Sequence, residues 1–93
     1  MSINYRVTLD DGGAWSVEQI TMQGEDEVSL TLNEGTLPAW SVKEGRYDRL
    51  VEFAREQLGD LPVTGDPVVS DGMFVNNAGF TCMVVHFTWG SDD

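Results

Sequence analysis

Cys82 and His86 are the only cysteine and the only histidine of the chain, and both lie in the closing segment GFTCMVVHFTWGSDD. A cysteine next to a histidine can form a nucleophilic dyad, and the two side chains can also share a metal ion. Either site needs side-chain contact. The alternation around them predicts a β-strand, in which residues four apart share a face with their Cα atoms about 13 Å apart. We therefore expect no joint site: Cys82 is predicted to be an inert packing residue, and His86 a structural or exposed residue of the sheet.

Other catalytic or ligand-binding motifs are not found in the sequence. It holds no G-x-S-x-G motif, no P-loop and no set of His or Cys residues at metal-ligand spacing. Gly12 and Gly13 could form an amide-lined turn, but Asp10 and Asp11 beside them would repel a phosphate. The segment GEDE, residues 24 to 27, lacks the ligand pattern of an EF-hand. An acid–base carboxylate pair stays open as an alternative, because sequence does not show which carboxylates meet. The prediction is a protein without enzymatic activity, cofactor or metal.

The first half of the chain predicts three strands, because its apolar residues alternate with polar ones. These strands are expected at residues 3 to 9, 14 to 22 and 28 to 33, joined by the turn segments DDGG and QGEDE. Within the second strand, Trp15 and Val17 follow one phase, whereas Ile20 and Met22 follow the other. This change of phase predicts a bulge near Glu18 and Gln19.

A helix is expected over residues 42 to 58, because the apolar residues there recur at the spacing of a helix and no longer at every second position. Ser41 and Glu44 fit a capping box at its start, and Gly59 is a suitable stop at its end. The stripe that would face the sheet consists of Tyr47, Leu50, Val51, Ala54 and Leu58.

The remaining segments predict a loop, two strands and a hairpin turn. Residues 59 to 67 form the loop, and a strand runs from Val68 to Val75 with a break at Asp71 and Gly72. The turn NNAG then leads into a last strand from Phe80 to Trp89. One face of this strand is wholly apolar, which indicates a central strand covered by the helix.

The order of the predicted elements is β-β-β-α-β-β. It indicates an α+β fold: an antiparallel sheet of about five strands with one helix packed on one face. The 93 residues form a single domain, 1–93, because a chain of this length has material for only one modest core.

The charge of the chain limits its possible partners. Sixteen acidic residues against five basic ones give a net charge of -11, which argues against direct binding to nucleic acid or to an anionic membrane. The chain has no apolar run of the ~20 residues that a membrane span needs. The start, MSINYR, lacks the apolar run of a signal peptide, so we expect a cytoplasmic protein.

Chain direction predicts that many of the carboxylates gather at one end of the domain, which we term the acidic pole. If each hairpin reverses the chain, the second turn, the loop after the helix and the tail reach the same end. Trp40, just before the expected helix, is a candidate exposed anchor, whereas Trp15 and Trp89 are expected in the core. The acidic residues expected at the pole are Glu25, Asp26, Glu27, Asp60, Asp66, Asp92 and Asp93.

An acidic pole fits a binding protein that masks a basic, nucleic-acid-binding surface of a protein partner. In size and charge the chain is similar to anti-CRISPR proteins and other phage-encoded DNA mimics, although no motif carries this likeness. One alternative is an immunity protein that neutralises a basic nuclease toxin. Another is an acidic structural domain whose charge only maintains solubility. The sequence leaves the oligomeric state open.

Overall fold

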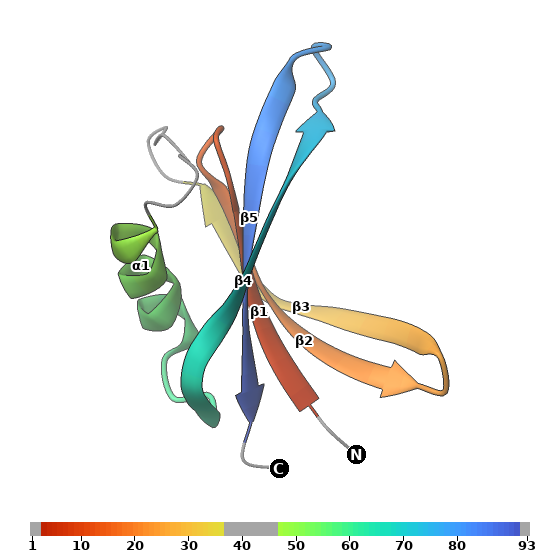
Figure 1. Ribbon diagram of the computed structural model, residues 1–93, viewed down its shortest axis with the longest axis vertical. Coiled ribbons are helices and arrows are strands. Elements are labelled where there is room, and N and C mark those ends of the chain that lie inside the picture. Colours follow the sequence, from red (N-terminus) through yellow and green to blue (C-terminus); the bar gives the residue numbers. More distant parts are fainter. Residues whose placement is uncertain (1–2, 37–46, 92–93) are drawn as a thin grey trace.

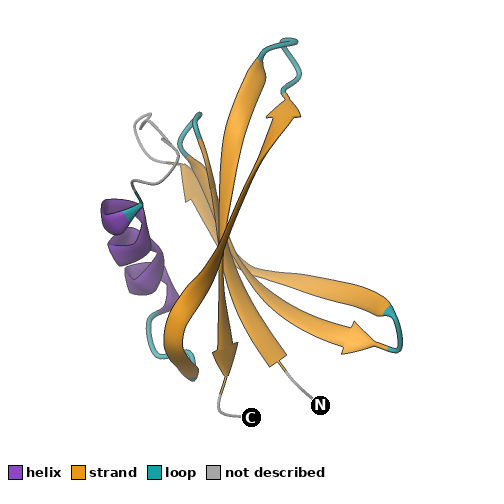
Figure 2. Cartoon of the chain, viewed as in Figure 1, coloured by secondary structure: helices purple, strands orange, loops and turns teal. Residues whose placement is uncertain are grey.

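Where the structure describes the chain, it forms a five-stranded sheet with a helix beside it. The computed structural model describes residues 3–36 and 47–91. Its elements are β1 (Ile3–Asp10), β2 (Ala14–Gln23), β3 (Asp26–Thr36), α1 (Asp48–Leu58), β4 (Val63–Val75) and β5 (Thr81–Ser91). The strands form an antiparallel sheet in the order β3-β2-β1-β5-β4, and α1 covers one face (Figures 1 and 2). The predicted α+β fold is confirmed, and the last strand lies inside the sheet as expected.

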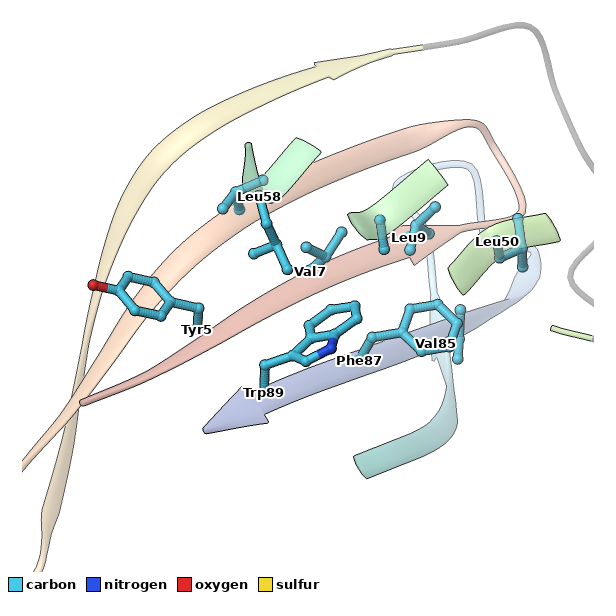
Figure 3. Packing of buried hydrophobic residues seen from close by; sticks show 10 residues of the cluster. Tyr5, Val7, Leu9, Leu50, Leu58, Val85, Phe87 and Trp89 are labelled. Atoms are coloured by element: carbon cyan, nitrogen blue, oxygen red, sulfur yellow. The ribbon is translucent and has the colours of Figure 1, made fainter. Parts of the chain in front are cut away.

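The core lies between α1 and the middle of the sheet (Figure 3). Alternate residues of β1 and β5 point toward the helix, because successive side chains of a strand face opposite sides. Phe87 meets the ring of Tyr47 edge-on, with 6.0 Å between the ring centroids. The buried residues of this cluster are Tyr5, Val7, Leu9, Val17, Leu50, Ala54, Leu58, Val85, Phe87 and Trp89. Trp89 is in the core as predicted, whereas Trp15 is only partly buried against it.

The helix starts later than the sequence suggests. It begins at Asp48, with Tyr47 as the N-cap residue and no capping bond from a side chain. The predicted capping-box residues Ser41 and Glu44 lie outside the described residues. The end of the helix agrees with the prediction: Gly59 follows Leu58 with a φ of 57°, a conformation that glycine adopts without steric cost.

The predicted bulge near Glu18 is confirmed in position, because the register of β2 with β3 shifts between Val17 and Glu18, but the extra residue lies on β3 and not on β2. β1 and β2 pair without interruption from Ile3 opposite Thr21 to Leu9 opposite Trp15. Between β2 and β3, however, Val17 pairs with Asn33 and Glu18 with Thr31. Leu32 is therefore the extra residue.

The continuous pairing with β1 also explains the change of phase in β2. Val17 pairs with Val7 of the core, whereas Ile20 pairs with Asn4 and so faces the side of the sheet opposite the helix. The two sets of apolar residues in β2 therefore point to the two opposite faces of a regular strand. They do not belong to one face that a bulge interrupts.

β4 is longer and more regular than predicted. It runs from Val63 to Val75, so part of the expected loop belongs to the strand. The register shifts between Thr64 and Val68, a stretch that contains Pro67, and not at Asp71 and Gly72. Gly72 pairs opposite Val84 in regular register. The Asp71–Gly72 pair resembles a turn in the sequence, yet the ladder tolerates it.

Twist separates the two edges of the sheet. Adjacent strands rotate by about 20–25° relative to one another, so four steps from β3 to β4 add up to roughly 80–100°. In Figure 1 the β2–β3 hairpin and the β4–β5 hairpin accordingly extend in different directions. Within the described residues, no helix is long and apolar enough to cross a membrane.

Candidate protein-binding surface

β3 is an edge strand that faces solvent along its whole length. All of its residues are exposed except Gly35, which is half-buried. Val28, Leu30 and Leu32 are among its exposed side chains, and Leu30 is 59% exposed. Among the described strands, β3 pairs only with β2. It thus presents apolar side chains together with the open hydrogen-bonding groups of a sheet edge, which are a template for another chain.

Carboxylates stand at both ends of this apolar edge. Glu25 and Asp26 lie in and beside the turn between β2 and β3, and both are exposed. Gly24 has a φ of 67°, which allows this tight turn. Glu27 follows on β3, and Glu34 lies near the other end of the strand. We call Glu25, Asp26 and Glu27 the hairpin acidic group.

Glu27 differs from the other two members of this group, because it is tied to the sheet. Its Oε1 atom accepts a hydrogen bond from Nη2 of Arg6 at 2.9 Å. Arg6 belongs to β1 and Glu27 to β3, so the ion pair spans β2. The register places Ile20 between them on the same face. Ile20 is only 4% exposed although it lies outside the core cluster, and we attribute its burial to this ion pair above it.

Asp60 and Asp66 lie near the opposite edge of the sheet. Asp60 follows the helix, and Asp66 lies in the irregular part of β4, 3.7 Å from Nη2 of Arg55. The hairpin acidic group belongs to the β3 edge. Four strand spacings, about 19 Å measured across the sheet, lie between the two edges. The described residues of the predicted pole therefore form two separate groups. Trp40, Asp92 and Asp93, the other predicted site residues, lie outside the described residues.

A shallow depression of about 190 Å³ adjoins the far end of β3. It is lined by Thr8, Asp10, Ala14, Trp15, Ser16 and Glu34. The carboxylate of Asp10 already accepts the backbone N–H groups of Gly12 and Ala14, at 2.8 and 3.1 Å. Glu34 contributes acidic character at this end. It was not among the predicted site residues, and the strand register brings it beside Ser16 and Thr8.

Cys82 and His86 do not form a joint site. β5 pairs regularly with β4 through both, with Cys82 opposite Phe74 and His86 opposite Ser70. Cys82 is half-buried and lies outside the core cluster, with Nδ2 of Asn76 at 3.4 Å from its sulfur, so it packs within the β4–β5 hairpin and not in the core. In the described ranges 3–36 and 47–91, no three His, Cys, Asp or Glu side chains come together as metal ligands.

The environment of His86 favours its neutral form. Nδ1 of the ring lies 2.9 Å from the hydroxyl oxygen of Thr8. Partial burial lowers the pKa of His86 below its ordinary 6.5, and the positive charge of Arg6 lowers it further, while Glu18 acts in the opposite direction.

This lowered pKa predicts a pH dependence of stability. Below pH 6.5 the unfolded chain binds a proton at His86 more readily than the folded chain does, so protonation favours unfolding. The contribution of His86 is complete above that pH and is lost as the pH falls. We expect the wild type to lose more unfolding free energy between pH 7.5 and pH 5 than the His86→Gln variant, measured by urea denaturation. The carboxylates titrate in both proteins, so their effect cancels. An equal or larger loss in the variant would contradict the assignment.

Comparison of the chain with protein-family models, with curated proteins and with solved structures finds no match. The function of the surface has to be inferred from its own residues.

Proposed function

We propose that this protein is a non-catalytic binding protein that masks a basic, nucleic-acid-binding surface of a protein partner in the cytoplasm. The observation that carries the proposal is the β3 edge, where exposed apolar side chains lie between carboxylates at either end. Single exposed apolar residues are common on protein surfaces, but a continuous apolar edge strand is a feature of interaction sites.

The two kinds of group on this edge have different roles in binding. The exposed carboxylates of Glu25 and Asp26 attract a surface rich in Lys and Arg, which speeds association and fixes orientation. Val28, Leu30 and Leu32 supply the apolar contact that becomes buried in the complex. The open strand edge allows main-chain pairing with the partner. The same net charge of -11 disfavours binding to nucleic acid itself.

The preferred partner is a nucleic-acid-binding protein or complex, as for an anti-CRISPR or another DNA mimic encoded by a phage or mobile element. A second candidate, an immunity protein for a basic nuclease toxin, is favoured by one observation. The hairpin acidic group is compact and lies apart from Asp60 and Asp66. Such a group suits a single basic cleft better than a long groove that holds a duplex.

A pair of matched charge-reversal variants tests the proposal. The first variant is Glu25→Lys/Asp26→Lys, which leaves Glu27 and its ion pair with Arg6 intact. The second is Glu52→Lys/Glu56→Lys, which makes the same change of charge on exposed positions of α1. If the β3 edge binds the partner, the first variant should lose at least about tenfold in affinity and the second should bind like the wild type.

The binding partner for these measurements comes from pull-downs at low and moderate salt. A nucleic-acid effector complex favours the lead proposal, and a single basic nuclease favours the immunity protein. Equal binding by wild type and both variants would contradict a role for the hairpin acidic group. If no partner is sensitive to salt, the acidity serves only the solubility of the domain.

A further inference from the structure

The β4–β5 hairpin has the opposite character to β3. From Gly72 to Gly90 the sequence contains no Asp, Glu, Lys or Arg, although the chain as a whole carries a net charge of -11. β1 pairs with β5 only as far as Asp10 opposite Val84, so the end of the hairpin projects beyond the rest of the sheet (Figure 1). Val75 and Phe80 in this part are 67% and 70% exposed.

β4 offers a second open edge along this apolar hairpin. Among the described strands it pairs only with β5. The register of β4 shifts between Thr64 and Val68, a stretch that contains Pro67, so the regular part of the strand begins at Val68. The turn that begins at Asn76 ends the strand at the other side. The usable edge is the segment 68–76. The exposed large apolar residues of this hairpin are Val68, Val69, Met73, Phe74, Val75 and Phe80.

The distribution of charge indicates what covers this edge. A basic partner would find only one carboxylate in the segment 68–76, that of Asp71, which accepts a hydrogen bond from the hydroxyl of Tyr47. An anionic lipid surface repels a chain of net charge -11. Two copies of this chain also repel one another at most approaches, and antiparallel pairing through β3 would bring the hairpin acidic group of each copy close to Glu34 of the other. β4 is the edge where two copies bury apolar surface with the least repulsion.

We propose that two copies pair antiparallel through β4, about a two-fold axis that passes beside Gly72. An axis perpendicular to the sheet keeps each face on its own side, so residues that lie opposite one another must point to the same face. An axis at Asp71 would place two Asp71 carboxylates directly opposite each other, which is destabilising. An axis at Gly72 instead places Val69 opposite Val75 of the second copy and Asp71 opposite Met73. It also uses the segment 68–76 from end to end.

The resulting dimer is one continuous sheet with the β3 strands at its two outer edges. The proposed partner-binding surface stays accessible in it, so the dimer neither requires nor excludes the proposed function. A seam of nine residues per copy is a small interface. We therefore expect weak association, with a dissociation constant of about 1–100 μM.

Mass in solution as a function of concentration gives the first test. Sedimentation or light scattering should show the 10.3 kDa monomer at low concentration and twice that mass at several hundred micromolar.

Val75→Lys places a charge opposite Val69 of the second copy and should abolish the dimer. Val75 lies on the exposed hairpin away from the core, so the circular dichroism spectrum should not change. Thr31→Lys makes the same kind of change on the β3 edge and should leave the dimer intact. A monomer at every concentration, or a dimer that Val75→Lys does not weaken, would overturn the proposal.

A disulfide tests the position of the axis. A Cβ atom at Gly72 would meet only Cγ1 of Val84, at 3.9 Å, so a cysteine fits there. Opposite residues of an antiparallel pair have Cα atoms about 4.5–5.5 Å apart, which lies within the range for a disulfide. In a Cys82→Ser background, mild oxidation should crosslink Gly72→Cys and not Thr31→Cys. Crosslinking of Thr31→Cys alone would place the contact at β3 and overturn the proposal.

Discussion

Replacement of Phe87 by alanine should lower the free energy of unfolding by about 3–5 kcal/mol. Phe87 is fully buried on β5, an interior strand of the sheet. Its ring meets Tyr47 edge-on and lies 6.3 Å from the Trp89 ring, between centroids. Alanine removes these contacts and leaves a cavity that the sheet cannot close. Small domains are stable by about 5–15 kcal/mol, so the loss is a large part of the total. Urea denaturation followed by far-ultraviolet circular dichroism measures it.

Phe80→Ala is the matched control for this prediction. It deletes the same atoms from a side chain that is 70% exposed, so we expect a change within about 0.5 kcal/mol. Both variants are measured at submicromolar concentration, below the lowest dissociation constant expected for the dimer, so that association contributes little. Similar losses in the two variants would show that burial against the helix does not decide the stability of β5.

The strands of the core could be predicted from sequence, because a period of two reports which residues share a face. Phe87 and Trp89 alternate with His86 and Thr88, and both are buried in the core together with Val85. The same rule predicted the strand at β3 but not its exposure. α1 has 11 residues and is about 16 Å long, so it covers the middle of the sheet and not its edges. Which strands the helix covers is decided by the folded domain. The alternation that includes Leu30 and Leu32 therefore predicts a strand but does not tell whether the helix covers it.

The candidate site was predicted in part. Chain direction correctly assigns Glu25 to the turn between the second and third strands, because hairpin connections are short, whereas Asp26 and Glu27, expected in the same turn, already belong to β3. It cannot supply strand order or twist, and these place Asp66 at the edge opposite to β3. The ion pair of Glu27 with Arg6 was also beyond sequence, since the two residues belong to strands that are not neighbours. Local sequence patterns identify the charged residues, whereas the register between strands decides which of the carboxylates are already in ion pairs.

Replacement of Gly35 by alanine should destabilise the protein by about 1–3 kcal/mol. Gly35 lies opposite Trp15, and a Cβ atom there would be 2.7 Å from Cζ2 and 2.9 Å from Cε2 of the indole. The ring cannot turn away freely, because it packs edge-on against Phe53 of α1 at 5.7 Å between centroids. Alanine must therefore displace the indole or the strand. Thermal or urea unfolding of the variant measures the cost.

A double-mutant cycle with Trp15→Leu separates this collision from any effect of the backbone. Gly35 does not have a positive φ, so alanine can adopt its conformation. Within a strand, alanine is normally about 0.5–1 kcal/mol more favourable than glycine. Once leucine has removed the indole, Gly35→Ala should be neutral or stabilising, so the substitution changes sign between the two backgrounds. The same destabilisation in both would exclude the indole as its cause. A change of sign would show that the absence of a side chain at Gly35 makes room for the indole of Trp15. The indole lies where the core meets the proposed binding surface.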